Sequence, residues 1–135
     1  MISGKFAISV HILTLLAKSP DEFQTSEYIA GSINLNPVLV RKEIANLKKH
    51  HFVESKEGKN GGTRLALAPE KISLEAIFKI TFDTISLGFS KNDPNPACPV
   101  GKQINKNLNV LYESINDKVR LQLKGISLLE FADKF

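Results

Sequence analysis

The segment from Asn36 to Arg64 carries side chains of the types that contact a polyanion. Its excess of basic over acidic residues equals the net charge of the whole chain, +4. Its basic residues are Arg41, Lys42, Lys48, Lys49, Lys56, Lys59 and Arg64, and its acidic residues are Glu43, Glu54 and Glu57. A basic excess confined to one segment is typical of a face that binds nucleic acid. On charge alone, a solvated helix face with ordinary lysines is an equal alternative.

The residue types used in catalysis and metal binding lack the spacing that such chemistry requires. His50 and His51 are adjacent, so their side chains point in different directions on a helix, and His11 has no ligand spacing to either. The sequence has no glycine-rich phosphate loop followed by Lys-Ser/Thr. We therefore expect no catalytic residues, no metal and no cofactor.

Cys98 is the single cysteine of the sequence. It precedes an expected helix N-terminus, where the helix dipole lowers the pKa of a thiol and would suit a redox switch. An inert loop cysteine is the commoner explanation of the same position.

The composition is that of an ordinary globular chain. The 135 residues are 42% hydrophobic and 24% charged. No run approaches ~18 uninterrupted apolar residues, and the N-terminus lacks the features of a secretory signal. One cysteine excludes an intrachain disulfide framework. These features predict a cytoplasmic protein, without a membrane partner, made of one domain or of one domain with an oligomerisation arm.

Two short helices are expected to position the basic residues. The first follows a cap at Thr25 or Ser26 and ends near Ile33. Asn36 and Pro37 open the second, which runs to His50. A helix-turn-helix places the N-terminal residues of its second helix in the major groove of DNA. The residues predicted to contact DNA from this helix are Asn36, Pro37, Val38, Leu39, Arg41, Lys42, Asn46 and Lys49.

Particular base contacts follow from these residue types. Arg41 could contact guanine with two hydrogen bonds, and Asn36 could bond adenine or a phosphate. Val38 or Leu39 could pack on a thymine methyl group. Capping the helix would also fully explain Asn36.

A glycine-rich hairpin follows the second helix. Short strands are expected at 53–56 and 64–68, and three glycines between them allow positive φ and close backbone approach. The residues predicted to contact the minor groove or phosphates from this wing are Lys56, Lys59, Asn60, Gly61, Gly62, Thr63 and Arg64. Such a hairpin directly after a helix-turn-helix predicts a winged helix-turn-helix.

The remaining segments predict a mainly α fold with one small β-hairpin. A helix over 5–18 is apolar on most sides and should be buried against more than one partner. A helix from 74 to about 84 follows a Ser73 cap, and a loop over 86–101 contains three prolines. A long helix over 101–124 ends at Gly125, and a short helix begins at Ser127.

The long helix carries an apolar stripe that requires a partner surface. Its predicted dimerisation residues are Ile104, Leu108, Leu111, Ile115 and Val119. The expected organisation is a winged helix-turn-helix DNA-binding domain over 1–84, a loop over 85–100, and a dimerisation helix with a C-terminal helix over 101–135.

The order of motifs resembles one protein family along nearly the whole chain. The motifs are Ile29-Ala30, Val40, Leu47, Phe52-Val53, Gly58, Gly61-Gly62, Arg64-Leu65-Ala66, Ile72-Ser73-Leu74, Cys98-Pro99-Val100-Gly101 and Ile126-Ser127-Leu128. They resemble the Rrf-two (Rrf2) family of bacterial transcription regulators, and within it the YwnA-like branch without iron–sulfur ligands. The resemblance implies a homodimer joined by the long helix and bound to a palindromic operator in double-stranded DNA.

The sequence departs from the cluster-binding members of that family. Those members carry three cysteines in the loop before the dimer helix, whereas this sequence has Cys98 alone. An iron–sulfur cluster needs about four ligands, and a dimer would supply two thiolates. Iron–sulfur sensing is therefore not expected.

The sequence thus favours a homodimeric, sequence-specific DNA-binding transcription regulator, a repressor rather than an activator. The alternative is a winged-helix adaptor that binds protein and sequesters a partner enzyme. Three glutamates reduce the positive charge of the basic segment and keep this alternative open. Either activity would leave room for an unknown effector or partner protein.

Overall fold

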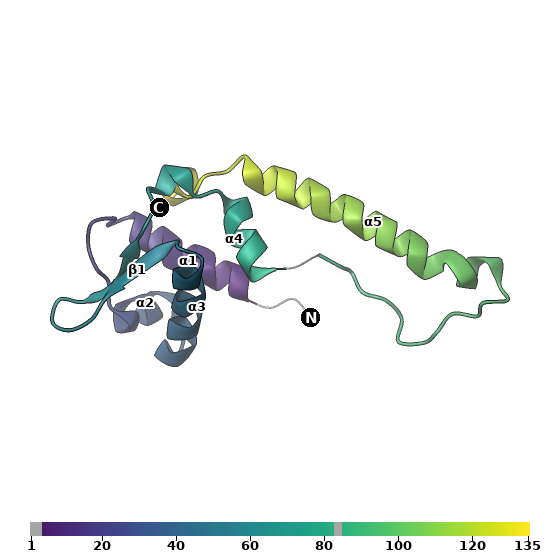
Figure 1. Cartoon of the computed structure of the whole chain (residues 1–135), viewed down its shortest axis with the longest axis horizontal. Coiled ribbons are helices and arrows are strands. Elements are labelled where there is room, and N and C mark those ends of the chain that lie inside the picture. The colour runs from purple at the N-terminus through teal and green to yellow at the C-terminus, as the bar shows by residue number, and fades with distance from the viewer. Residues whose placement is uncertain (1–3, 83–84) are drawn as a thin grey trace.

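The computed structural model describes residues 4–82 and 85–135. The described chain is mainly helical with a two-stranded antiparallel hairpin, which confirms the predicted fold class (Figure 1). Its elements are α1 (Lys5–Ala17), α2 (Ser26–Ile33), α3 (Pro37–Lys49), β1 (Val53–Lys56), β2 (Gly62–Leu65), the 3-10 turn η1 (Pro69–Lys71), α4 (Leu74–Thr81), α5 (Pro99–Lys124) and α6 (Leu128–Ala132).

Helix α1 lies at the centre of the fold. Its side chains Ile12, Leu13 and Leu16 have no exposed surface. It contacts α2, α3, β2, α4 and α6, so the expectation of burial against more than one partner is confirmed. Burying each of these large aliphatic side chains contributes about 1.5–3 kcal/mol to folding. Helix α3 packs directly against α1, so α1 fixes its position.

Local hydrogen bonds set the ends of α2 and α3. The hydroxyl of Thr25 accepts from the Tyr28 N–H at 3.1 Å, and the carbonyl of the Asn36 side chain accepts from the Val38 N–H at 2.9 Å. Between the helices Asn34 adopts a left-handed conformation with φ 59°. The two predicted helices and their caps are confirmed, because capping and turn residues act over short stretches of chain.

The hairpin pairs β1 with β2 in a register that sets Val53 opposite Leu65 and Lys56 opposite Gly62. The prediction of a second strand over 64–68 was wrong, since β2 begins two residues earlier and ends at Leu65. The cause is a contact distant in sequence. The backbone of Thr63 exchanges two hydrogen bonds of 2.8 Å with Gln24, which fixes the start of β2 from its other side.

Two helix boundaries also differ from the expectation. Helix α4 ends at Thr81, because Phe82 is extended with φ −135° and ψ 142°; residues 83 and 84 lie outside the described residues. Helix α5 begins at Pro99 rather than Gly101, with Cys98 at the N-cap. Proline suits the first helical position, where its missing N–H costs no hydrogen bond.

The C-terminal helix α6 returns to the head, by which we mean residues 4–82 and 126–135. Leu128 is fully buried in the core, and its N–H donates to the carbonyl of Ile72 at 2.7 Å. The N–H of Leu74 in turn donates to the carbonyl of Ile126 at 2.9 Å. Residues 85–125 form an arm that extends away from the head (Figure 1). None of the described helices has the length and apolarity needed to cross a membrane.

Candidate nucleic-acid interface

Helix α3 has a buried face and an exposed face, as its sequence predicted. Val40, Ile44 and Leu47 are buried in the core. The exposed face carries Val38 and Leu39 at the start of the helix, with 65% and 49% of their surfaces exposed. Large apolar side chains at the exposed start of a helix-turn-helix are suited to pack on thymine methyl groups.

Arg41 is held in place by a residue of the preceding helix. Its Nη2 donates to Glu27 Oε1 at 2.8 Å, and both side chains are more than half exposed. The backbone N–H of Glu27 itself, and then the Arg41 hydrogen bond, lower the pKa of the Glu27 carboxyl. The guanidinium has five N–H donors, so this pair leaves most of them available. Glu27 therefore orients the Arg41 side chain and leaves most of its N–H donors available for DNA.

Two asparagines of this helix have different surroundings. The Oδ1 atom of Asn36 caps the helix, which leaves its amide N–H groups available to an acceptor on DNA. Asn46, in contrast, donates from Nδ2 to the backbone carbonyl of Ile80 at 3.2 Å. That bond joins α3 to α4, so in this structure Asn46 positions the helix instead of presenting its amide to solvent.

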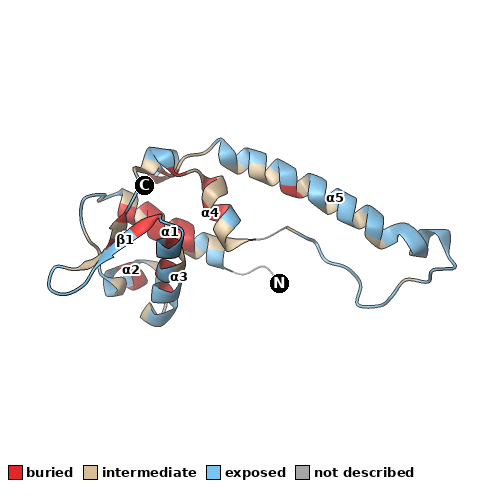
Figure 2. Cartoon of the chain, in the orientation of Figure 1, coloured by how far each residue is buried: buried red, intermediate tan, exposed pale blue. Residues whose placement is uncertain are grey.

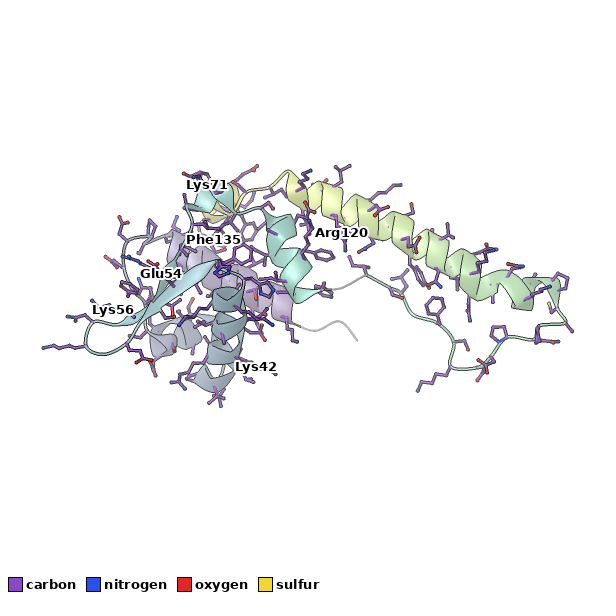
Figure 3. All side chains as sticks on the ribbon, viewed as in Figure 1. Lys42, Glu54, Lys56, Lys71, Arg120 and Phe135 are labelled. Atoms are coloured by element: carbon purple, nitrogen blue, oxygen red, sulfur yellow. The ribbon has the colours of Figure 1, made fainter. Side chains whose placement is uncertain are left out.

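The lysines of α3 project into solvent. Lys42, Lys48 and Lys49 are exposed, and Figure 3 shows Lys42 near the lower end of the helix. Lys48 and Lys49 lie in the last turn, where cations also interact favourably with the helix dipole. These charges are available to neutralise phosphates on either side of a groove.

The wing presents its cations around an aromatic ring that the sequence analysis missed. The Arg64 guanidinium lies 4.3 Å from the centre of the Phe23 ring, and the Lys56 ammonium lies 5.8 Å from it. Arg64 also donates to Glu54 Oε1 at 2.6 Å across the hairpin. Phe23 precedes the Gln24 bridge to β2, a contact that no local sequence signal indicates. Phe23 thus holds both cations on one side of the wing.

The predicted roles of Gly61 and Gly62 change with the structure. A Cβ on Gly62 would lie 2.4 Å from the backbone oxygen of Gln24, and one on Gly61 would lie 2.2 Å from that of Lys56. The close approach that these glycines permit is therefore to the protein's own backbone. Thr63 in β2 is buried, whereas Lys59 and Asn60 at the tip are exposed. The wing can reach DNA through its tip and through Lys56 and Arg64.

The arm holds the other predicted site residues. Of the helix stripe, Leu111 is 51% and Ile104 36% exposed, and Leu108, Ile115 and Val119 are partly buried within one chain. Cys98 is exposed at the N-cap of α5. The N–H groups of Gly101 and then Val100 lower the pKa of its thiol.

Comparison with known proteins gives a consistent set of relatives. The family model described as Rrf2, iron-dependent transcriptional regulator, matches residues 2–134. The chain is 38% identical over 128 residues to the HTH-type transcriptional regulator YwnA of Bacillus subtilis, covering 95% of this chain and 94% of that protein. It is 30% identical over 114 residues to the HTH-type transcriptional regulator NsrR of Halalkalibacterium halodurans, covering 84% and 77%.

Solved structures agree with these sequence relatives. A transcriptional regulator of Lactobacillus plantarum superposes with a TM-score of 0.76 at 28% identity, covering 94% of this chain and 86% of that chain. CymR, the global cysteine regulator of B. subtilis, superposes with a TM-score of 0.75 at 25% identity, covering 100% and 98%.

The iron in the description of the family model has no matching ligand set in this chain. The sequence contains one cysteine, whereas an iron–sulfur cluster needs about four ligands. Over residues 4–82 and 85–135, no group of three or more His, Cys, Asp or Glu side chains could hold a metal ion. The donor set therefore does not fit an iron centre.

Proposed function

Because the chain belongs to the Rrf2 family of transcriptional regulators, we propose that it is a homodimeric repressor that binds a palindromic DNA operator without an iron cofactor. The observation that supports this proposal most is the combination of α3 and the wing. Both lie on the side of the head away from α5 (Figure 1), and both carry exposed cations.

Helix α3 is proposed to enter the major groove with its N-terminal turns. Arg41, oriented by Glu27, would donate two hydrogen bonds to guanine, and the free amide of Asn36 would donate to adenine or a phosphate. Val38 and Leu39 would contact thymine methyl groups, and Lys42 and Lys49 would contact phosphates. Pro37 would fix the start of the helix.

The wing is proposed to lie along the minor groove or the adjacent backbone. Lys59 and Asn60 at the tip would reach furthest, and Lys56 and Arg64 would follow nearer the head. Each phosphate neutralised releases condensed counterions, so this contact would contribute affinity for any DNA sequence.

The proposed dimer supplies the second copy of this face. In α5 the buried residue is Asn116; of the apolar stripe, Ile104 and Leu111 stay exposed in one chain, and Leu108, Ile115 and Val119 are only partly buried. Pairing of two such helices would bury the stripe and place two α3 helices in major grooves about 34 Å apart. A dimer that covers an operator in the cytoplasm excludes other proteins from it, which is the simplest route to repression.

The first test is selection of bound sequences from a random DNA pool, followed by anisotropy titrations on the selected site. Arg41→Ala should cost about 1–3 kcal/mol on that site and relax its base preference. Lys59→Ala should weaken binding to all duplexes and flatten the salt dependence. A reporter gene behind the site should be expressed more strongly when the protein is removed.

The competing function is a protein-binding adaptor, which the glutamates paired with Arg41 and Arg64 favour because they reduce the positive field. The salt series distinguishes the two functions. A DNA-binding protein loses affinity for random duplex steeply as salt rises. If selection enriches no sequence and duplex affinity does not depend on salt, the repressor proposal is wrong.

A further inference from the structure

A cavity of about 490 Å³ lies in the head, on a face that the proposed DNA contacts do not use. It is lined by residues of α1, by Ser32 of α2, and by Phe131 and Phe135 at the C-terminal end of the chain. Figure 3 shows Phe135 beside α1, on the opposite side of the head from Lys42. Its volume falls in the usual range of small-molecule sites, about 300–1,000 Å³.

The cavity borders an apolar face of α1 that the core covers only in part. The core covers the face that carries Ile12, Leu13 and Leu16. Ala7, which lines the cavity, is exposed, and Leu15, on its wall, is only partly buried. An apolar helix face that stays open next to a concave surface is suited to a ligand.

The walls of the cavity are aromatic. Phe6 lines one side, and Phe131 and Phe135 line another with their rings edge to face at 5.6 Å and 60°. Aromatic rings favour further aromatic groups in offset or edge-to-face arrangements. The body of a fitting ligand is therefore aromatic.

Most polar groups of the cavity form a line along α1, and the remaining one, Ser32 of α2, is hydrogen-bonded to His11 at 2.9 Å. His11, Thr14 and Lys18 all line it, and helical spacing places them on one face. The two ionisable side chains among the lining residues, His11 and Lys18, are both basic, and two nearby exposed acids, Glu130 of α6 and Asp133 at its C-cap, do not line it. This charge pattern favours an anionic group on the ligand.

The hydroxyl of Thr14 is a second feature of the cavity that suits a hydrogen-bonding ligand. Thr14 is only 8% exposed, and its Oγ1 has no hydrogen-bond partner among the described residues. In this rotamer Oγ1 is shielded from solvent. Thr14 is itself one of the residues that line the cavity, and threonine in a helix has two accessible χ1 rotamers. Lys18 lies one turn further on, so one carboxylate could accept from both residues.

We propose that this cavity binds a small aromatic carboxylate, with the ring among Phe6, Phe131 and Phe135 and the carboxylate at Thr14 and Lys18. Lys18 now donates to the backbone carbonyl of Ala132 at 3.3 Å, a weak bond that a carboxylate would replace. The proposal concerns binding by the protein alone and does not depend on the DNA function.

The test uses 2-naphthoate and its uncharged analogue 2-naphthamide on the full chain, with binding measured by calorimetry and by amide chemical shifts. Naphthoate should bind about two- to fivefold more tightly than the amide, as expected for one exposed charge pair. Lys18→Gln should remove that difference and leave the affinity for naphthamide unchanged. Shifts should concentrate on α1 and α6.

A filling variant provides the stricter test. Ala7→Trp places a large side chain into the cavity from an exposed helical position and should weaken both compounds at least tenfold. Ala45→Trp adds the same side chain at an exposed position of α3 outside the cavity and should change neither affinity.

Three results would overturn the proposal. The first is absence of binding by either compound, and the second is binding that Ala7→Trp leaves intact. The third is a change of sedimentation coefficient on Ala7→Trp without compound binding, which would show that a second copy of the chain covers this face.

Discussion

The head and the arm of this protein use their apolar residues in opposite ways. In the head, α1 alone buries four apolar side chains, and the cluster continues through α3, the hairpin, α4 and α6. In α5 the buried residue is Asn116, while Val110, Leu111 and Leu121 are 61%, 51% and 73% exposed (Figure 2).

This difference shows which part of the fold is complete in one chain. The head encloses its core, so its geometry is set by the chain itself. The 26-residue helix α5 packs against α4 and is bonded through Asn116 and Tyr112 to Ile85 and Gly88, yet several of its apolar side chains remain exposed. These exposed apolar side chains are the physical basis of the proposed dimer.

The largest expected effect contrasts a core residue with an arm residue. Leu13→Ala leaves a cavity in the head and should lower the free energy of unfolding by about 2–5 kcal/mol. Leu121→Ala lies off the apolar stripe of α5 and should cost less than about 0.5 kcal/mol. Urea unfolding followed by circular dichroism measures both. Similar losses would mean that Leu121 is buried in the assembled protein.

The second effect concerns which face of α5 is paired. Leu111→Glu buries a charge in the proposed interface and should raise the dimer dissociation constant at least about 100-fold. Val110→Glu is the matched control, because one residue along a helix turns the side chain by about 100°. Sedimentation over a concentration series compares the two. Dissociation by the Val110 variant alone would assign the interface to another face.

The third effect tests the aromatic support of the wing. Phe23→Leu keeps an apolar side chain but removes the ring beneath Arg64 and Lys56, so DNA affinity should fall about three- to tenfold. Phe89 also packs on an aromatic residue, Tyr112, but lies in the arm. Phe89→Leu should therefore leave DNA affinity unchanged in the same anisotropy titration. Equal losses would show that the wing does not need its support.

The smallest effect is on the reactivity of Cys98. A lowered pKa means that the thiolate forms at lower pH, so the midpoint of the alkylation rate against pH should lie below that of the same chain unfolded in urea. The N–H groups of Gly101 and Val100 cause this shift. Val100→Pro removes one of them and should move the midpoint upward. A folded midpoint at or above the unfolded one would contradict the assignment.

Local signals predicted much of the head and part of the site. The caps at Thr25, Asn36 and Ser73 could be read from the sequence because each acts within three residues of its partner. The exposure of the first turns of α3 and of the wing tip could also be predicted, from helical and hairpin spacing respectively.

The remaining features depend on contacts between distant segments. Phe23 reaches Arg64 because Gln24 pairs with Thr63, and the same pairing buries Thr63 and moves the start of β2. Asn46 is turned inward by the end of α4. The position of α6 in the core of the head was also not predicted. Periodicity describes one element at a time, so it cannot assign such partners.

The backbone hydrogen bonds that join residues 72–74 to residues 126–128 bear on how the length of the arm can vary. The Leu74 N–H donates to Ile126 and the Leu128 N–H donates to Ile72, so the chain that returns from the arm is fastened to the head beside the start of α4. The arm is therefore an insertion between two segments of the head, and its length can change without moving the residues that would contact DNA. In a dimer paired through α5, the length of the arm would determine the distance between the two α3 helices. The arm would thereby determine the spacing of the two half-sites, while α3 would determine their base sequence.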